Sequence, residues 1–468
     1  MIFRQYYLEC LSHASYLVGD DRTGRAVVVD PQRDVADYLA DAASARLKIE
    51  RVIETHFHAD FLSGHLELAA ATGASICFGP GAEAEFPIVT LSDRARISLG
   101  DVELEIRATP GHTPESISIV VWERATDETP YGVLTGDTMF IGDVGRPDLL
   151  VSTGRPATDL ARELYRSLHT RLLDLPDETR VFPTHGAGSA CGRQLSTETQ
   201  STIGHERRTN YALLPMTEDS FVALITEGQP TAPHYFPFSA QRNREDRPLL
   251  DEEQPPAPLA HRDVMSLVVS GAAVLDTRDA SDFAGGHLAG SISVSLAGRF
   301  AEYAGDVVRP DQPIVLVCDP GREHEAKIRL ARIGFDRVLG YLRDPLRLFV
   351  DRPDLVARSS RVSALELRNR IVAGSRLMVV DVRNPDETSE GVIEGAVVIP
   401  LPNLIDRLDE IDASVPVVIY CASGVRSAVA ASVVAAQGHD DVSDLLGGYA
   451  AWAMMGPPSS VRTMPTTM

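Results

Sequence analysis

The feature that most constrains the fold is an internal repeat of roughly a hundred residues in the second half of the chain. Three apolar segments recur in order: 274–278 (VLDTR) as 379–383 (VVDVR), 286–294 (GHLAGSISV) as 391–399 (GVIEGAVVI), and 313–318 (PIVLVC) as 416–421 (PVVIYC). Short continuous apolar runs followed by helical patterns are typical of parallel strands buried on both faces. A repeat of this length is too long for a solenoid. The sequence therefore predicts two homologous α/β domains, each with a central parallel sheet.

The remaining length leaves room for at least one further domain, because 468 residues predict two to four domains in total. A formal net charge of −22 argues against nucleic-acid and anionic-membrane partners, which need a basic face. The N-terminus lacks the pattern of a signal peptide, and no run reaches the about 18 apolar residues of a membrane span. The five cysteines are widely spaced without a CxxC pair, so we expect a reducing, cytoplasmic compartment and no disulfide framework.

The first half alternates β-rich apolar runs with helical stretches. It predicts strands at 24–31, 51–55, 103–110, 116–123, 131–136 and 180–185. We expect an N-terminal domain over 1–228, a Pro-rich linker or arm over 229–260, and repeat domains over 261–352 and 358–460. The arm contains Tyr235, Phe236 and Phe238, which are too apolar for a free linker. We therefore expect the arm to pack on a domain.

Metal-ligating residue types gather at the predicted strand ends of the first half. Residues 55–65 (THFHADFLSGH) follow a strand and place His56, His58 and Asp60 in one loop. Three later strand ends carry His112, Asp137 and His185. Imidazole and carboxylate groups are the ligands that transition metals prefer in proteins. The set predicts a metal site built from these loops.

This ordered set resembles the metallo-β-lactamase superfamily over roughly residues 1–215. The resemblance implies an αββα sandwich with metal bound at one edge of its two sheets. Phe61 occupies the position of a histidine that helps to hold a second metal ion in the superfamily. The remaining His56, His112 and Asp137 match the facial triad of non-haem Fe(II) oxygenases.

The family most similar in this respect is the persulfide dioxygenases, which implies one Fe(II) per chain as cofactor. His58, Asp60 and His185 are then expected to orient the ligands or to hydrogen-bond the substrate. A second metal ion held by these three residues stays open.

Substrate contacts are suggested by residues 142–148 (GDVGRPD), which are similar to a stretch that follows the metal aspartate in that family. The resemblance implies that Arg146 binds the anionic persulfide; a structural ion pair with Asp148 is the alternative. The tyrosine of glutathione-using relatives is absent after His185, so glutathione, coenzyme A or another thiol remains open as carrier. Cys191 could hold a transient persulfide or be a buried thiol.

The second repeat carries a nucleophile pattern. Cys421 ends an apolar run and is followed by a helical pattern, so unpaired backbone N–H groups at the helix start would stabilise its thiolate. The Cys-x4-Arg spacing to Arg426 resembles the six-residue loop of rhodaneses, over about 360–455, and not the longer Cys-x5-Arg loop of cysteine phosphatases. The resemblance implies catalysis by Cys421 and Arg426, with substrate binding by Ser423, Gly424 and Val425.

The first repeat resembles a degenerate rhodanese. Cys318 lies in the same strand register as Cys421, but its loop to Arg322 is one residue shorter. Asp319 places a negative charge beside the thiol, and Pro320 removes an N–H donor. We expect this copy to be a structural or docking domain.

The order of the three domains resembles bacterial persulfide dioxygenase–sulfurtransferase fusions. This implies oxidation of a low-molecular-weight thiol persulfide by O₂ to sulfite, and formation or use of thiosulfate through a persulfide on Cys421. Such proteins serve sulfide oxidation and are expected to form homo-oligomers. Two alternatives stay open: a binuclear-zinc thioester hydrolase of glyoxalase II type with rhodanese appendages, and a non-catalytic sulfur-carrier or interaction module.

Overall fold

The computed structural model describes residues 1–149, 154–389 and 391–456, which form two compact units. Unit 1 comprises residues 1–257, 297–312 and 322–338, and unit 2 comprises 258–296, 313–321 and the chain from 339 onward. The expected domain boundaries stay a prediction, and the end of the expected range 358–460 lies outside the described residues. Among the helices described, none is long and apolar enough to cross a bilayer.

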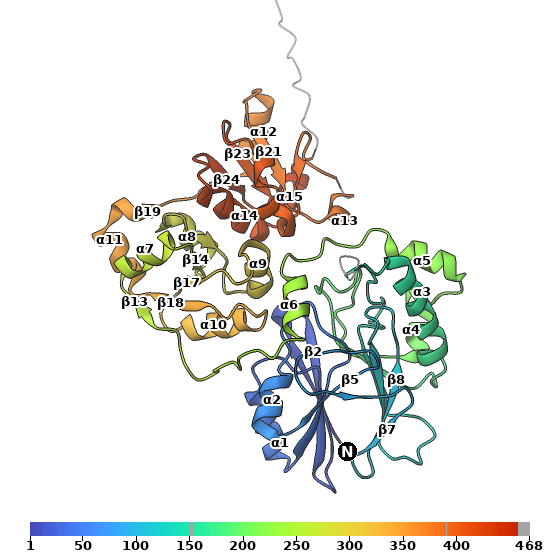
Figure 1. Cartoon of the computed structure of the whole chain (residues 1–468). Coiled ribbons are helices and arrows are strands. Elements are labelled where there is room, and N and C mark those ends of the chain that lie inside the picture. Colours follow the sequence, from blue (N-terminus) through green and yellow to red (C-terminus); the bar gives the residue numbers. More distant parts are fainter. Residues whose placement is uncertain (150–153, 390, 457–468) are drawn as a thin grey trace, which may run out of the picture. The chain divides into compact units, whose positions relative to one another are not determined.

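Unit 1 contains two six-stranded sheets that pack face to face (Figure 1). The first sheet has the order β1 (Ile2–Leu8), β2 (His13–Asp20), β3 (Arg25–Val29), β4 (Lys48–Ile53), β5 (Ser75–Phe78) and β6 (Val89–Thr90). The second has the order β12 (Ser201–Thr202), β11 (Arg180–Pro183), β10 (Gly132–Gly136), β9 (Ile117–Trp122), β8 (Glu103–Ala108) and β7 (Arg96–Ser98). All six strands predicted for this region are present.

Helices cover both outer faces of the sheet pair (Figure 1). The first sheet carries α1 (Ala36–Ser44) and α2 (His65–Thr72), and the second carries α3 (Ala157–Ser167), α4 (Ile203–Thr209) and α5 (Glu218–Thr226). The predicted αββα sandwich is therefore confirmed.

Alternation along the strands explains how three hydrophobic layers form. In β2, Tyr16 and Val18 point into the core between the sheets, whereas Leu17 packs with Tyr38 of α1 and Leu68 of α2. Successive side chains of a strand face opposite sides, so a strand in the middle of a layered fold is buried on both. Every residue of β2 is buried. This burial explains why β2 has no alternating polar pattern. Neither β1 nor β2 is among the strands that the sequence predicted.

Unit 2 contains the two predicted parallel sheets. The first has the order β13 (Pro258–Leu259), β18 (Val338–Leu342), β17 (Ile314–Val317), β14 (Ala273–Asp276) and β16 (Ile292–Ser293). The second has the order β20 (Ser360–Val362), β24 (Val442–Leu445), β23 (Val417–Tyr420), β21 (Met378–Asp381) and β22 (Val397–Val398). Asp276 pairs with Val317 in the first sheet as Asp381 pairs with Tyr420 in the second. The repeat of two α/β domains is confirmed.

Helices and a short antiparallel strand pair complete these domains. The first copy has α7 (His261–Val269), α8 (Ala280–Gly285) and α11 (Pro345–Asp351), with β15 (His287–Leu288) beside β19 (Val356–Ala357). The second copy has α12 (Ala364–Val372), α13 (Pro385–Thr388), α14 (Val425–Ala436) and α15 (Gly448–Met454).

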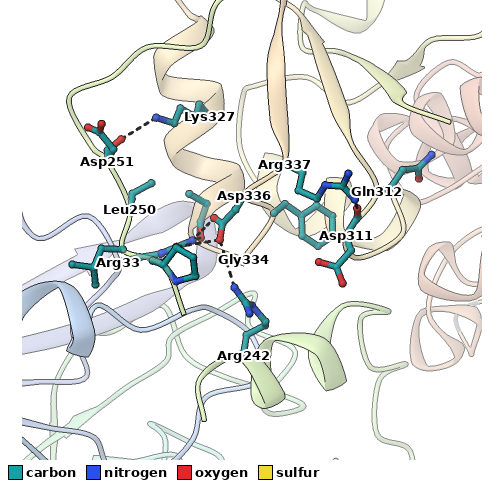
Figure 2. Close-up of a pocket in the computed structure, with 14 residues that line it drawn as sticks. Arg33, Arg242, Leu250, Asp251, Asp311, Gln312, Lys327, Gly334, Asp336 and Arg337 are labelled. Atoms are coloured by element: carbon teal, nitrogen blue, oxygen red, sulfur yellow. Dashed lines mark hydrogen bonds and ion pairs between the residues drawn. The ribbon is translucent and has the colours of Figure 1, made fainter. Parts of the chain in front are cut away.

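The arm, residues 229–260, packs along unit 1 up to residue 257. Tyr235 and Phe236 are buried, as the sequence predicts, and α6 (Phe236–Arg242) follows them. Two helices from the first repeat, α9 (Phe300–Val307) and α10 (Glu323–Ala331), also belong to unit 1. The Lys327 amine of α10 donates to the arm carbonyl of Asp251 at 2.9 Å, at the edge of a cavity of about 360 Å³ (Figure 2). Arg33 and Asp336, which also line this cavity, form an ion pair with each other.

The buried carboxylate of Asp20 joins the two sheets at one end of the sandwich. It accepts hydrogen bonds from the backbone N–H groups of Arg22, Thr23, Asp101 and Val102. The first two lie in the turn after β2, and the other two precede β8. Burial raises the pKa of Asp20, but these donors outweigh it and hold the pKa at about 2.

We predict that Asp20→Asn lowers the free energy of unfolding of unit 1 by about 1–3 kcal/mol at pH 7, because it weakens charge-assisted hydrogen bonds. The folded pKa lies below the ordinary 3.8, so the stabilisation is present above pH 4 and disappears toward pH 2. Urea unfolding followed by Trp122 fluorescence in a Trp452→Phe background measures it. Equal free energies of unfolding for Asp20→Asn and wild type at pH 7 would show that the hydrogen bonds of Asp20 do not stabilise the sandwich.

Candidate metal centre and sulfur-transfer loop

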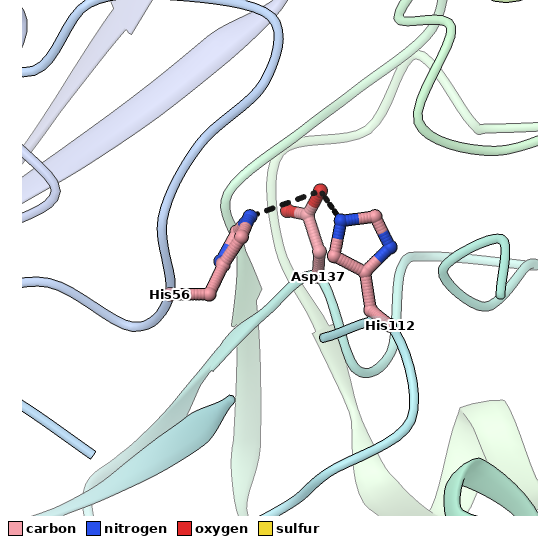
Figure 3. Close-up of side chains that lie close together, drawn as sticks. All are labelled: His56, His112 and Asp137. Atoms are coloured by element: carbon pink, nitrogen blue, oxygen red, sulfur yellow. Dashed lines mark ion pairs between the residues drawn. The ribbon is translucent and has the colours of Figure 1, made fainter. Parts of the chain in front are cut away.

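The strand ends of unit 1 bring the predicted ligands together. His56 follows β4, His112 follows β8, Asp137 follows β10 and His185 follows β11. Atom Nε2 of His56 lies 3.8 Å and Nε2 of His112 lies 3.5 Å from Oδ2 of Asp137, and all three side chains point to one spot (Figure 3). Atom Nε2 of His185 lies 3.6 Å from the other oxygen, Oδ1.

Each of these imidazoles is oriented through its other nitrogen. The partners of Nδ1 are the Thr55 hydroxyl for His56 at 3.0 Å, the Arg146 carbonyl for His112 at 2.9 Å and the Ser12 carbonyl for His185 at 3.1 Å. Thr55 gives its own hydrogen to Asp30, so it accepts from His56. With Nδ1 as donor in every case, the lone pair of Nε2 faces Asp137.

Burial sets the charge state of this site. It lowers the pKa of His56 well below its ordinary value and that of His112 to about 4, and it raises the pKa of Asp137 to about 6. Within the described residues, Nε2 of His56 and both carboxylate oxygens of Asp137 lack a hydrogen-bond partner. Buried polar atoms left without partners are costly. The donor set of His56, His112 and Asp137 therefore fits a metal ion.

The second predicted set, His58, Asp60 and His185, also converges. However, Nε2 of His58 lies 3.1 Å from Asp30 and 3.3 Å from Glu54. Burial lowers the pKa of His58, but the two carboxylates outweigh it and raise the pKa well above its ordinary value. The Phe61 ring lies 4.4 Å from that of His58, centroid to centroid. These contacts favour His58 as an ion-paired cation over a metal ligand.

Asp30 is a site residue that the sequence analysis missed. It follows β3 and accepts hydrogen bonds from Thr55 through N–H at 2.7 Å and hydroxyl at 2.9 Å, and from the Thr184 hydroxyl at 3.2 Å. A carboxylate directly after a buried strand is the signal that identified Asp137, and it was available here too.

Two further predicted residues lie at this site. The buried Arg146 forms a bidentate ion pair with Asp148 at 2.7 and 2.6 Å, the contact of the structural alternative. A role in binding persulfide stays a prediction. Cys191 is buried beside Asp137 and His185, where burial and the nearby carboxylates raise its pKa well above the ordinary value.

The arm holds the metal loop, residues 55–65, in place. The amide of Asn243 donates to the carbonyls of His58 and Phe61, both at 2.8 Å, and accepts from the Ser63 N–H at 2.9 Å. The Tyr235 hydroxyl donates to the Asp60 carbonyl at 2.9 Å. These partners are far apart in sequence, and no local pattern of the arm predicts them.

In unit 2, Cys421 lies buried in the loop between β23 and α14. The Gly424 N–H donates to its Sγ at 3.1 Å, with Gly424 at a φ of +104° that favours glycine. Both the helix start and this N–H stabilise a negative sulfur. Arg426 forms a bidentate ion pair with Glu387 at 2.6 and 2.7 Å.

Close packing against α15 holds this loop from behind. The N–H of Tyr449 donates to the Cys421 carbonyl at 2.7 Å. A Cβ on Gly448 would lie 2.3 Å from the same carbonyl oxygen, so only glycine permits this approach.

The first copy differs at the corresponding turn. In the first copy Asp344 precedes α11, and in the second copy Gly447 precedes α15; both residues adopt the left-handed conformation. The next residue is Pro345 in the first copy and Gly448 in the second, so these two residues occupy equivalent positions. A proline ring cannot approach the loop as closely as a glycine. A cavity of about 790 Å³ lies there, lined on one side by Cys318, Asp319 and Pro320 and on the other by α11. This difference supports the prediction of a degenerate copy.

Comparisons with known proteins agree with this architecture. The family model "Metallo-beta-lactamase superfamily" matches residues 8–185, and "Rhodanese-like domain" matches 262–344 and 363–455. A solved structure of a metallo-beta-lactamase from Staphylococcus aureus is 33% identical, with a TM-score of 0.65, and the match covers 73% of this chain and 98% of that one. The chain belongs to the metallo-beta-lactamase superfamily. Two rhodanese-like domains follow its superfamily domain.

Curated relatives of the superfamily domain carry two different activities. Human "Persulfide dioxygenase ETHE1, mitochondrial" is 27% identical over 247 residues, 52% of this chain and 87% of that protein. Hydroxyacylglutathione hydrolase from Methylococcus capsulatus is 33% identical over 173 residues, 36% of this chain and 60% of that protein.

For the metal site we predict that His112→Ala lowers the affinity for Co²⁺, a spectroscopic probe, by at least about a hundredfold, because one of three donors is lost. The d–d absorption of the titrated protein measures the change. The matched control is His169→Ala, which removes an imidazole that hydrogen-bonds the carbonyl of Tyr165 and packs on its ring. Unchanged Co²⁺ binding in His112→Ala would exclude this donor set.

For the arm we predict that Asn243→Ala weakens Co²⁺ binding about ten- to a hundredfold, because two loop carbonyls and one N–H lose their buried partner. Asn243→Asp keeps the acceptor for Ser63 but turns a carboxylate oxygen toward the carbonyl oxygens of His58 and Phe61, so it should weaken Co²⁺ binding at least as much. Trp122 fluorescence checks that the sandwich is folded. Wild-type affinity in a folded Asn243→Ala protein would show that the arm does not support the metal loop.

Proposed function

We propose that the superfamily domain is an Fe(II)-dependent persulfide dioxygenase and that the last domain transfers sulfane sulfur through Cys421. The observation that carries the proposal is the donor set of His56, His112 and Asp137 at one point, next to a His58 held by carboxylates. Two imidazoles and one carboxylate are typical of non-haem iron oxygenases. Similarity to persulfide dioxygenase ETHE1 over most of that protein supports the same activity.

The reaction balances as RSSH + O₂ + H₂O giving RSH, sulfite and two protons. The sulfane sulfur is oxidised and O₂ is reduced. When bound, iron would be held by His56, His112 and Asp137 and would supply Lewis-acid and redox chemistry for the persulfide and O₂. The carrier of the sulfur is a low-molecular-weight thiol.

The protein's own residues hold and insulate this site. The Nδ1 hydrogen bonds of His56, His112 and His185 fix the imidazole planes, so that little reorganisation is needed on binding. The cationic His58 lies beside the ligands and offsets the negative charge of the buried carboxylates of Asp30 and Glu54. Burial of the ligands excludes bulk water.

Sulfur transfer uses Cys421 as nucleophile. Its thiolate attacks the sulfane sulfur of a donor and releases the donor's thiolate, which leaves a persulfide on the enzyme. Sulfite then attacks the outer sulfur, and thiosulfate leaves as Cys421 is restored. The two activities share sulfite, which is a product of one and a substrate of the other.

A zinc thioester hydrolase is the second candidate, and the similarity to hydroxyacylglutathione hydrolase favours it. That chemistry uses water activated by metal, commonly between two ions. Phe61 and the contacts of His58 argue against a second ion.

The decisive experiment combines metal analysis with O₂ uptake on a defined persulfide in wild type and Cys421→Ser. We expect iron, O₂ consumption in both proteins, and a shift of product from thiosulfate in wild type to sulfite in the variant. The matched control is Cys318→Ser, at the same register of the first copy, which should leave thiosulfate formation intact.

Zinc with thioester turnover and no O₂ uptake would replace the dioxygenase with the hydrolase. Unchanged thiosulfate output in Cys421→Ser would remove the sulfur-transfer role, and slow alkylation of Cys421 near neutral pH would agree with a non-catalytic module.

A further inference from the structure

The cavity of about 790 Å³ in the first repeat lies where the second repeat packs α15 against its cysteine loop. Its walls are the loop at residues 318–320, α8 with the residue after it, α11, and the segment 356–358 that contains β19. Pockets that bind small organic molecules usually measure about 300–1,000 Å³. The cavity is therefore large enough for such a molecule, and the reactions proposed above do not use it.

One wall of the cavity is an apolar stripe of α11. Leu346, Phe349 and Val350 line the cavity, and their spacing of three and four residues places them on one face of the helix. Leu346 is 69% exposed and Val350 is 74% exposed, whereas Leu348 is buried in the core of the domain. Contact with an apolar body would remove the stripe from water. This wall therefore suits the hydrocarbon or aromatic part of a ligand.

The charged groups of the cavity leave an excess of negative charge. Three aspartates and three arginines line it: Asp282, Asp319, Asp344, Arg278, Arg347 and Arg358. Arg278 is already paired with Asp276 at 2.9 Å, and Arg347 is paired with Asp351 at 2.8 Å. Neither of these two partners is a lining residue, so at most Arg358 is left to offset the three aspartates.

Two of the three aspartates lie close to the apolar wall. Burial lowers the pKa of Arg278, but neighbouring carboxylates outweigh burial and raise it; they are Asp276, Asp282 and Asp319. The Arg278 guanidinium also lies over the ring of Phe349, 5.2 Å from the ring centroid. Carboxylates and apolar side chains therefore meet around one space.

The cysteine loops of the two repeats differ in the charge that they present. The loop of the second repeat supplies Arg426 at its end. The loop of the first repeat presents Asp319 to the cavity, and Arg322 at its end pairs with Glu325 at 2.7 Å. The first repeat has thus replaced a cation beside its loop with a carboxylate that faces an open space.

We propose that the cavity of the first repeat binds small organic cations that join an ammonium group to an aliphatic or aromatic body. The ammonium group lies among the three aspartates, and the body packs on the apolar stripe of α11. Burial of the stripe supplies affinity, and the excess of negative charge supplies selectivity. Anionic persulfide, sulfite and thiosulfate are repelled, so this cavity does not compete for them with the other two domains. The inference depends neither on iron nor on Cys421.

The test is a fluorescence titration of the full chain with two probes that share one fluorophore. Dansylcadaverine ends in a primary amine and dansylglycine ends in a carboxylate, so the comparison isolates the charge of the ligand. We expect dansylcadaverine to bind at least about tenfold more tightly at low ionic strength, with a preference that shrinks as salt is added. Equal affinities, tighter binding of dansylglycine, or no binding of dansylcadaverine at millimolar concentration would overturn the proposal.

Two variants place the binding in this cavity. Asp319→Asn removes a charge at nearly constant size and should weaken dansylcadaverine by about threefold or more, without weakening dansylglycine. Val350→Ser removes an apolar contact and should weaken both probes by about threefold or more. Both residues are exposed, so both variants should fold, which circular dichroism checks. The matched control is Asp440→Asn, which removes an exposed aspartate before β24 of the second repeat and should alter neither affinity.

The control variant separates a local site from the attraction of a cation by the whole protein, whose net charge is −22. If Asp440→Asn weakens dansylcadaverine as much as Asp319→Asn does, the binding follows the net charge and the proposal is overturned. If Asp319→Asn and Val350→Ser both keep wild-type affinity, the probe binds elsewhere and the proposal is also overturned. Loss of affinity in these two variants with an unchanged control supports it. None of these outcomes alters the proposed function, because the titration measures binding and needs no turnover.

Discussion

The carboxylate of Asp30 is the contact on which the metal-binding half of the protein depends. It joins the end of β3 to Thr55 after β4, to Thr184 after β11 in the opposite sheet, and to His58 in the metal loop. A charge buried to this degree is tolerated only when it is paired and hydrogen-bonded, so the surrounding strand ends have little freedom. Thr55 in turn orients His56. Sheet alignment and ligand geometry are thus fixed by the same group.

The two repeats show how one scaffold can support or lose a reactive loop. Both place a cysteine at the end of the central strand, at the same register. In the second copy, Gly448 lets α15 pack against the loop from behind. In the first, Pro345 stands at that position and a cavity lies beside Cys318. Both copies have a cysteine, so the difference between their loops comes from the residue at this one turn, glycine in the second copy and proline in the first.

Much of the site was predictable because strand ends are visible in sequence. His56, His112 and Asp137 each follow an apolar run, and parallel or neighbouring strands bring such ends to one edge. The same reasoning puts Cys421 and Gly424 in the turn between a strand and a helix, where the structure has them; their roles stay a prediction. The strands β1 and β2 were missed because β2 is buried on both faces and has no alternating pattern.

Contacts between distant segments were beyond reach of the sequence. Asn243 bonds three backbone groups of a loop about 180 residues away, and nothing in its neighbourhood distinguishes it from a polar linker residue. For Arg146 the sequence left two partners open, a substrate anion and Asp148, because a guanidinium can bind either equally well. The structure shows the pair with Asp148.

The arm has a consequence for how this chain can be divided. A fragment that ends at residue 228 keeps every strand of both sheets but leaves the carbonyls of His58, Asp60 and Phe61 without the side chains that bind them. The domain that carries the metal ligands is therefore completed by residues encoded after it, including α9 and α10 from the neighbouring repeat. The parts of this chain are therefore linked in folding and are not freely exchangeable modules.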